Sequence, residues 1–277
     1  MLGAGPSARR SQCPGRRPPA PHPATREPTA RETTTSEPPP PDPLVVRTLL
    51  GARWAPSVPA GTMAAMTPSA SERAVLVEEL RRRGPDAPTL CAGWTARDLA
   101  AHLVVRERRP DAALGIVVPP LAGHGERVRA AVAARPFDVL LDLVASGPPR
   151  LSPFALPGVE TAVNTGEHFV HAEDVRRAGD APAEPRALPA AVRRALWGGL
   201  RGRARLLYRR SPVGVVLETP EGRVVARRAP DGAGTVVLRG DVGEVLLHSF
   251  GREAVARVEV EGSPEDVRAL AGVDRAV

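Results

Sequence analysis

Residues 164–174 read Asn-Thr-Gly-Glu-His-Phe-Val-His-Ala-Glu-Asp, and this stretch combines helical spacing with two histidines and three acids. Each residue of an α-helix advances by about 100°, so Glu167 and His171 lie about 40° apart on one face. Asp174 lies within about 20° of Glu167 on the same stripe. Two valines border this stripe, so we expect it beside the buried side of a helix.

A carboxylate and an imidazole that are buried together are costly unless something pairs them. A divalent ion would do so, because Glu167 and His171, four residues apart in a helix, can converge on one ion. His102, on the apolar face of an earlier helix, is the third candidate ligand. Three protein ligands leave an open position for water or substrate. We expect Asp174 to accept a hydrogen bond from the other ring nitrogen of His171 and to fix its tautomer.

Simpler interpretations of these residues remain open. Glu167 and His171 also fit an ordinary i, i+4 pair, and His102 also fits a hydrogen-bonded core residue. His168 forms a rival pair with His171, but it lies about 100° from Glu167 and leaves the stripe. Cys91 has no histidine or base beside it in sequence, which favours packing before a turn over a reactive thiol. The remaining histidines have no partner at ligand spacing and are interpreted as structural or exposed: His22, His124 and His248.

The chain has 277 residues, and all 38 of its basic residues are arginine, which indicates the codon bias of a GC-rich bacterial genome. Residues 1–62 hold 14 of the 32 prolines. Such a segment buries too little apolar surface to fold. We therefore predict a disordered Pro/Arg-rich extension over residues 1–66, with the natural start at Met63 or Met66. A nucleic-acid-binding arm is the functional alternative.

Charge and hydropathy argue against several classes of protein. Residues 63–277 carry 30 arginines and 27 acids, an ordinary balance, and aromatic residues are only 3% of the chain, so a nucleic-acid partner is not expected. No apolar run approaches the ~20 residues that a membrane span needs. Two cysteines, Cys13 and Cys91, make no disulfide framework. We expect a cytoplasmic protein.

The pattern of elements predicts two domains, 67–185 and 186–277. Four helical patterns with one long crossover predict a four-helix bundle in the first, at 70–84, 95–110, 124–146 with a break at Pro136, and 159–178. Thr95 and Asp98 form an acidic variant of a capping box. The second domain shows an α+β pattern, with helices at 188–208, 242–250 and from Ser263, and strands at 213–218, 223–227, 235–239 and 255–261.

Two motifs resemble the mycothiol-dependent maleylpyruvate isomerase family, which belongs to the DinB-like metal-binding bundles. They are Leu90-Cys-Ala-Gly-Trp-Thr-Ala-Arg-Asp-Leu-Ala-Ala-His102-Leu and Glu167-His-Phe-Val-His171-Ala-Glu-Asp174-Val-Arg-Arg. The resemblance covers about residues 70–277. Arg106-Glu-Arg-Arg-Pro-Asp-Ala-Ala and the Pro-Pro-Leu-Ala-Gly-His124 loop look like an actinobacterial subgroup described only as metal-binding.

The resemblance implies a mainly α protein in which a DinB-like four-helix bundle precedes a small, sterol-carrier-like α+β domain. It also implies His102, Glu167 and His171 as metal ligands. The segment Leu246-Leu-His-Ser-Phe-Gly-Arg252 resembles a family stretch that brings an arginine near the metal cleft. Arg252 is therefore the predicted clamp for a substrate carboxylate, through bidentate hydrogen bonds.

Two functional hypotheses follow. In the first, Zn²⁺ holds a small thiol, mycothiol by resemblance, as a thiolate that attacks a small electrophilic substrate in an isomerisation or thiol transfer. Fe²⁺, Ni²⁺ and Mn²⁺ also suit these ligands. In the second, the protein is a non-catalytic, metal-stabilised sensor or ligand-binding module. That module would have a closed metal shell, with Asp174 or His168 as the fourth ligand.

Overall fold

The computed structural model describes residues 66–112, 122–149, 152, 155, 160–179 and 183–273. All of these residues belong to one compact unit, Ser57–Val277. The predicted disordered extension lies outside the described residues, apart from Met66.

The described residues form nine helices and one four-stranded sheet, a mainly α protein with a small α+β part, as predicted. The helices are α3 (Pro68–Arg83), α4 (Ala96–Arg108), α6 (Ala122–Ala133), α7 (Phe137–Ala145), the π-helix η3 (Glu160–Asn164), α8 (Thr165–Arg176), α9 (Ala190–Leu207), α10 (Val242–Ser249) and α11 (Pro264–Ala271). The strands are β1 (Gly214–Thr219), β2 (Gly222–Arg227), β3 (Thr235–Arg239) and β4 (Glu259–Glu261). Assignment to the DinB-like and sterol-carrier-like classes, and the domain boundary after residue 185, stay predictions.

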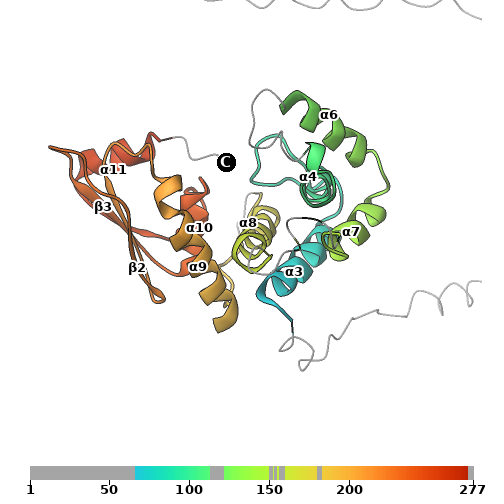
Figure 1. The fold of residues 1–277 in the computed structure, drawn as a ribbon, viewed down its shortest axis with the longest axis horizontal. Helices are drawn as coiled ribbons and strands as arrows, with labels where there is room; N and C mark the ends of the chain where they lie inside the picture. Colours follow the sequence, from blue (N-terminus) through green and yellow to red (C-terminus); the bar gives the residue numbers. More distant parts are fainter. Residues whose placement is uncertain are drawn as a thin grey trace, which may run out of the picture. The chain divides into compact units, whose positions relative to one another are not determined.

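Helices α3, α4, α6 and α7 enclose the first hydrophobic core together with one side of α8 (Figure 1). Helix α4 begins with the predicted capping box, in which Thr95 and Asp98 satisfy each other's backbone N–H groups. This cap sets the start of α4 and thereby the position of His102 two turns later. Leucines dominate the core, including Leu76, Leu99 and Leu140.

Helix α8 contributes to both hydrophobic cores. Ala172 and Val175 pack into the first core, whereas Phe169 and Val170 pack into the second. The predicted helix over 159–178 differs at its start, where Glu160–Asn164 adopts a π-helical turn before α8. Such turns change the phase of a helix and are frequent at functional sites. Here the turn directly precedes the helix that carries Glu167 and His171.

The second core lies between the sheet and helices α9 and α10 (Figure 1). The strand order is β2-β1-β3-β4, with β1 antiparallel to β2 and parallel to β3, and β3 antiparallel to β4. Strand β4 is shorter than the predicted 255–261, because pairing with β3 begins only at Glu259. This core holds α10 beside α8.

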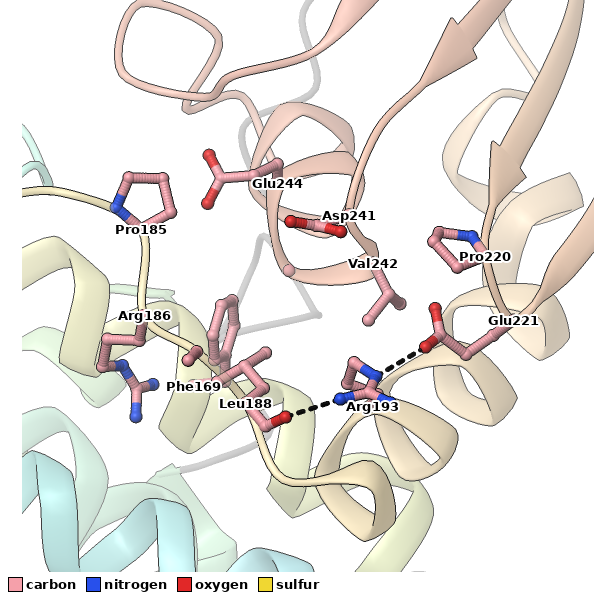
Figure 2. A pocket seen from close by; sticks show the side chains of 12 residues that line it. Phe169, Pro185, Arg186, Leu188, Arg193, Pro220, Glu221, Asp241, Val242 and Glu244 are labelled. Atoms are coloured by element: carbon pink, nitrogen blue, oxygen red, sulfur yellow. Dashed lines mark hydrogen bonds and ion pairs between the residues drawn. The ribbon is translucent and has the colours of Figure 1, made fainter.

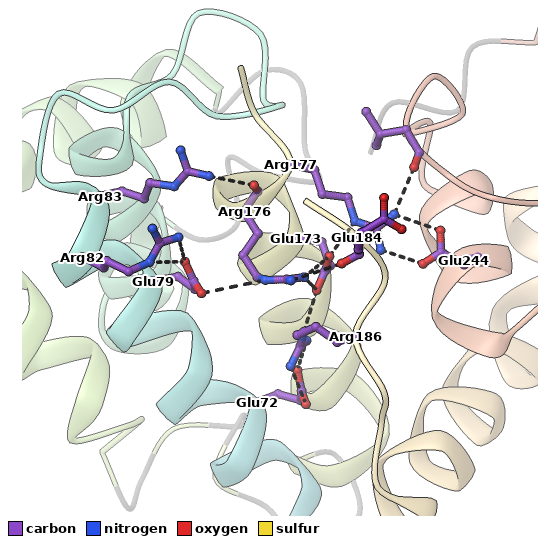
Figure 3. Close-up of polar contacts among 11 residues, drawn as sticks. Glu72, Glu79, Arg82, Arg83, Glu173, Arg176, Arg177, Glu184, Arg186 and Glu244 are labelled. Atoms are coloured by element: carbon purple, nitrogen blue, oxygen red, sulfur yellow. Dashed lines mark hydrogen bonds and ion pairs between the residues drawn. The ribbon is translucent and has the colours of Figure 1, made fainter. Parts of the chain in front are cut away.

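Buried ion pairs join α8 to α3, to α10 and to the segment before α9 (Figure 3). Arg186 reaches Glu72 of α3 and Glu173 of α8, each at 2.6 Å. Arg177, the residue that caps the end of α8, bonds Glu173 at 2.6 Å and Glu244 of α10 at 2.6 Å. These contacts fix α8 against its neighbours. Across the described part of the chain, no helix has the length and apolar character needed to cross a membrane.

Candidate metal centre

Three predicted ligand side chains, from α4 and α8, converge on one point. Nε2 of His102 lies 3.5 Å from Oε1 of Glu167. Nε2 of His171 lies 3.2 Å from the same oxygen. The ligand atoms of the three residues all lie within 4.8 Å of one another. The structure therefore brings together the two residues of the helical stripe and the distant histidine.

The spacing of these donors fits a tetrahedrally coordinated divalent ion. Bonds of about 2.0–2.1 Å from Zn²⁺ to nitrogen and oxygen place neighbouring ligands about 3.3–3.4 Å apart in a tetrahedron. The two N–O separations, 3.5 and 3.2 Å, lie on either side of that value. Two imidazoles and one carboxylate are donors that suit Zn²⁺ and other transition-metal ions. The residues thus fit the implied metal.

His102 is held between two rings. Its ring lies 5.2 Å from Trp94, which ends the turn before α4, and 5.5 Å from His171 in an edge-on arrangement. Burial lowers the pKa of His102 below its ordinary value, although a hydrogen bond with Glu167 opposes the effect. A neutral imidazole has a free lone pair, which is the form that binds a metal.

The partly buried Glu167 has surroundings that favour its charged form. Burial raises its pKa, but hydrogen bonds with His102 and His171 and the charge of Arg106 lower it well below the usual range. Nε of Arg106 lies 3.4 Å from Oε1 of Glu167, and Nη1 donates to Oδ1 of Asn164 at 3.0 Å. Arg106 therefore favours the ionised form of Glu167 and helps to hold its carboxylate in place.

Asp174 forms the expected hydrogen bond with the ring of His171. Oδ2 of Asp174 lies 2.9 Å from Nδ1 of His171, so Nε2 faces Glu167. Burial raises the pKa of Asp174, but His171 and Arg252 lower it to about 2. Burial lowers the pKa of His171, yet bonds to Asp174, Cys91 and Glu167 raise it well above the usual value. A metal and a proton would compete for Nε2 of His171.

Arg252 reaches the site from the segment after α10. Its Nε and Nη2 bond the two oxygens of Asp174 at 2.8 and 2.7 Å, and Nη1 donates to the carbonyl of Phe250 at 2.6 Å. The residue predicted as a carboxylate clamp thus makes a bidentate pair, with a carboxylate of the protein itself.

Cys91 belongs to the same cluster, which sequence spacing did not reveal. Its Sγ lies 3.2 Å from Oδ2 of Asp174 and 3.5 Å from Nη2 of Arg252. The backbone gives one reason for this approach, because the N–H of Leu90 donates to the carbonyl of Asp174 at 3.1 Å. Cys91 also packs against the first core just before α4, as the sequence favoured. Its acidic partner, Asp174, comes from α8 and not from the neighbouring sequence.

A second set of metal-competent atoms, from Cys91, His171 and Asp174, also lies within 4.8 Å. Arg252 disfavours a cation there, because its guanidinium already forms a bidentate pair with Asp174. An ion at this position would also take Nδ1 of His171 away from Asp174. The set formed by Glu167 and the two imidazole Nε2 atoms is the better candidate.

His168 points away from the candidate metal centre, as its helical angle predicted. Its ring is fully buried, with Nδ1 3.2 Å from the carbonyl of Ser69 and Nε2 3.4 Å from Glu107. Glu107 in turn forms a bidentate pair with Arg73. His124 is exposed, 3.2 Å from Asp111.

A separate pocket of about 300 Å³ lies beside α8, α9 and α10 (Figure 2). Phe169, Leu188 and Val242 supply its apolar wall, and Arg193 bonds Glu221 at 2.8 Å at its edge. None of the residues that line it is a predicted ligand or clamp. The pocket is thus distinct from the candidate metal centre.

Comparison with known proteins gives structural neighbours but no sequence relatives. No protein-family model matches the sequence, and no curated protein matches it. Two solved structures are similar to the chain: mycothiol-dependent maleylpyruvate isomerase, at 18% identity and a TM-score of 0.44, and its histidine-to-alanine mutant, at 17% and 0.48. Each comparison covers 70% of this chain and 90% of the other. The structural neighbours are thus proteins of the kind that the sequence resembles.

Proposed function

We propose that this chain binds one divalent ion, with Zn²⁺ expected, through His102, Glu167 and His171. We further propose that it is a thiol-dependent isomerase or transferase that acts on a small electrophilic substrate. The observation that carries the proposal is the convergence of two imidazole Nε2 atoms on one carboxylate oxygen, at 3.5 and 3.2 Å. Mycothiol as the thiol rests on the sequence resemblance.

The bound metal would supply one piece of chemistry: ligation lowers the pKa of a thiol and keeps it as the nucleophilic thiolate. The chain's own residues would prepare that site. Asp174 holds His171 with Nε2 turned inward. Hydrogen bonds with His102 and His171, together with the charge of Arg106, lower the pKa of Glu167 and keep it ionised. A reduced small thiol fits the predicted cytoplasmic location, where thiols are kept reduced.

The clamp role of Arg252 stays a prediction. A substrate carboxylate that used the guanidinium in a bidentate manner would have to displace Asp174, which holds it at 2.8 and 2.7 Å. Such an exchange would leave His171 and Cys91 as the side-chain partners of Asp174.

The alternative function, a non-catalytic sensor or ligand-binding module, requires a closed metal shell. The two candidates for a fourth ligand are engaged elsewhere among the described residues. Asp174 pairs with Arg252, and the ring of His168 contacts Glu107. An open coordination position favours the catalytic proposal.

Cobalt substitution tests whether a thiol reaches the metal. The full chain is loaded with Co²⁺, and absorption spectra are recorded during titration with mycothiol and, in parallel, with glutathione. We expect a thiolate-to-cobalt charge-transfer band with mycothiol in the parent protein. The His124→Ala variant, which changes an exposed histidine, should give the same band.

A Co²⁺ spectrum that neither thiol alters would favour the closed module and contradict thiol ligation. A His102→Ala variant that retained the full band would place the ion elsewhere. Catalysis is then examined with the zinc protein, mycothiol and a panel of small electrophiles, and product formation is followed by mass spectrometry.

A further inference from the structure

The pocket of Figure 2 is lined by a buried carboxylate that has one unpartnered oxygen. Glu221 follows Pro220 in the turn between β1 and β2, and its side chain is only 10% exposed. Oε1 of Glu221 accepts a hydrogen bond from Nε of Arg193 at 2.8 Å. Oε2 is buried, and among the described residues no donor reaches it. Most buried polar side-chain atoms have a partner, so this oxygen indicates a donor that the chain does not supply.

The carboxylate of Glu221 faces the interior of the pocket. Figure 2 shows its two oxygens at the inner end of the side chain, towards Arg193 and Val242. The terminal torsion of a glutamate is soft, so a small rotation presents Oε2 to the pocket without movement of the backbone. The apolar wall comes from Phe169, Leu188 and Val242. A volume of about 300 Å³ is at the lower end of the range for small-molecule sites. The pocket therefore suits a small molecule with an apolar part and a hydrogen-bond donor.

The other charged side chains of the lining fall into two groups. Arg186 and Glu244 belong to the buried ion pairs of Figure 3. The guanidinium of Arg193 is also occupied, by Glu221 and by a backbone carbonyl. Asp241 differs: it is exposed, it does not cap α10 with its side chain, and among the described residues it forms no ion pair. The lining thus offers two carboxylates, those of Glu221 and Asp241, that can accept further hydrogen bonds.

An ammonium group supplies what these two carboxylates need. It carries three N–H donors and a positive charge, whereas a hydroxyl group or a water molecule carries no charge. Hydrogen bonds between ionised groups are also stronger than those between neutral groups. A short alkyl chain attached to the ammonium would bury apolar surface against the wall of the pocket.

We propose that this pocket is a second binding site of the protein and takes a small primary ammonium ion with a short apolar chain. The ammonium group bonds Glu221 and Asp241, and the chain packs against Phe169, Leu188 and Val242. None of the candidate metal ligands lines the pocket. Binding there therefore does not require the metal ion.

Titration with n-butylammonium chloride tests the inference, and 1-butanol and sodium butyrate serve as probes of similar size without the positive charge. The full chain is titrated with each compound at constant ionic strength, and its backbone amide signals are followed by NMR. The amides of Val242 and Gly243, which line the pocket, are the reporters. We expect n-butylammonium to shift them saturably, 1-butanol to bind more weakly, and butyrate not to bind.

Glu221→Gln should bind n-butylammonium at least about 10-fold more weakly, because the amide loses the charge and one acceptor oxygen. Glu218→Gln is the matched control and should bind as the parent does. Glu218 lies on β1 of the same hairpin, pairs with Arg239 at the surface and does not line the pocket. Asp241→Asn should also weaken binding, although asparagine suits the start of α10 equally well. Thermal unfolding shows whether each variant remains folded.

Equal affinity in Glu221→Gln and the parent would overturn the inference, as would a parent spectrum that n-butylammonium leaves unchanged. Binding of 1-butanol as tight as that of n-butylammonium would contradict it too, because a neutral donor such as water would then satisfy Oε2. Preferential binding of butyrate would instead assign the site to the N–H groups at the start of α10. If Glu221→Gln does not fold, unchanged affinity in Asp241→Asn would overturn the role of the two carboxylates.

Discussion

Nδ1 of His171 lies 2.9 Å from Oδ2 of Asp174, and this contact turns Nε2 of the same ring towards Glu167. The same carboxylate takes a bidentate pair from Arg252. Asp174, three residues after His171 on α8, thus connects the imidazole of a candidate ligand to Arg252 of the α+β part. The contact makes Asp174 an orienting residue in our account.

We predict that Asp174→Asn binds zinc about 10–100-fold more weakly than the parent without losing the site. The neutral amide is a poorer acceptor for the N–H of His171 and a poorer partner for Arg252. Competition with a chromogenic chelator measures the affinity. Asp142→Asn, an exposed change on α7, is the control. Loss as complete as in His171→Ala would make Asp174 a ligand, and affinity equal to the parent would remove its orienting role.

Glu173 should be among the most sensitive positions for stability. Its fully buried carboxylate bonds Arg176 at 2.7 Å, and Arg177 and Arg186 at 2.6 Å each. Glu173→Gln would remove one of the two carboxylate partners of Arg177 and of Arg186, which keep Glu244 and Glu72. Breaking these buried pairs should cost about 3 kcal/mol in the free energy of unfolding. Urea denaturation measures the loss.

The control for this change is Glu78→Gln, because the Glu78–Arg81 pair is exposed at 3.2 Å on α3. It should alter stability by less than about 0.5 kcal/mol. A Glu173→Gln variant as stable as this control would show that the pairs of Figure 3 contribute little to the fold.

The capping box of α4 gives an acid-dependent contribution to stability. Burial raises the pKa of Asp98, but bonds with Arg129 and Thr95 lower it below the ordinary value of 3.8. The charged form therefore stabilises the fold above that value, and the contribution is lost as the pH falls below it. Asp98→Asn should cost about 1 kcal/mol at neutral pH and lessen the loss of stability below pH 3.8.

Thermal unfolding measured between neutral pH and pH 2.5 tests the direction of this pH dependence. Asp138→Asn, which changes an exposed aspartate, is the control. The difference between Asp98→Asn and the parent should shrink at acid pH. A difference that grew as the pH fell would contradict the assignment.

The parts of the fold and site that could be predicted from sequence are those that depend on short spacings. The capping box spans Thr95 to Asp98, and the helical angle that unites Glu167 with His171 spans one turn. His102 could be predicted because an imidazole on an apolar helix face needs a partner.

The contacts that sequence spacing missed join residues far apart in the chain. Cys91 meets Asp174 across 83 positions, and Arg252 meets it across 78. No local period encodes such approaches, because they arise when α8 packs between two cores.

Zinc stoichiometry provides the direct test that His102, Glu167 and His171 hold one divalent ion. The full chain, equilibrated with Zn²⁺ and freed of excess ion, is analysed by inductively coupled plasma mass spectrometry beside the exposed-histidine control His124→Ala. We expect about one zinc per chain in both, and almost none in a His102→Ala, His171→Ala double variant that retains its helical circular dichroism. Full zinc occupancy in that folded double variant, or none in the parent, would contradict the account.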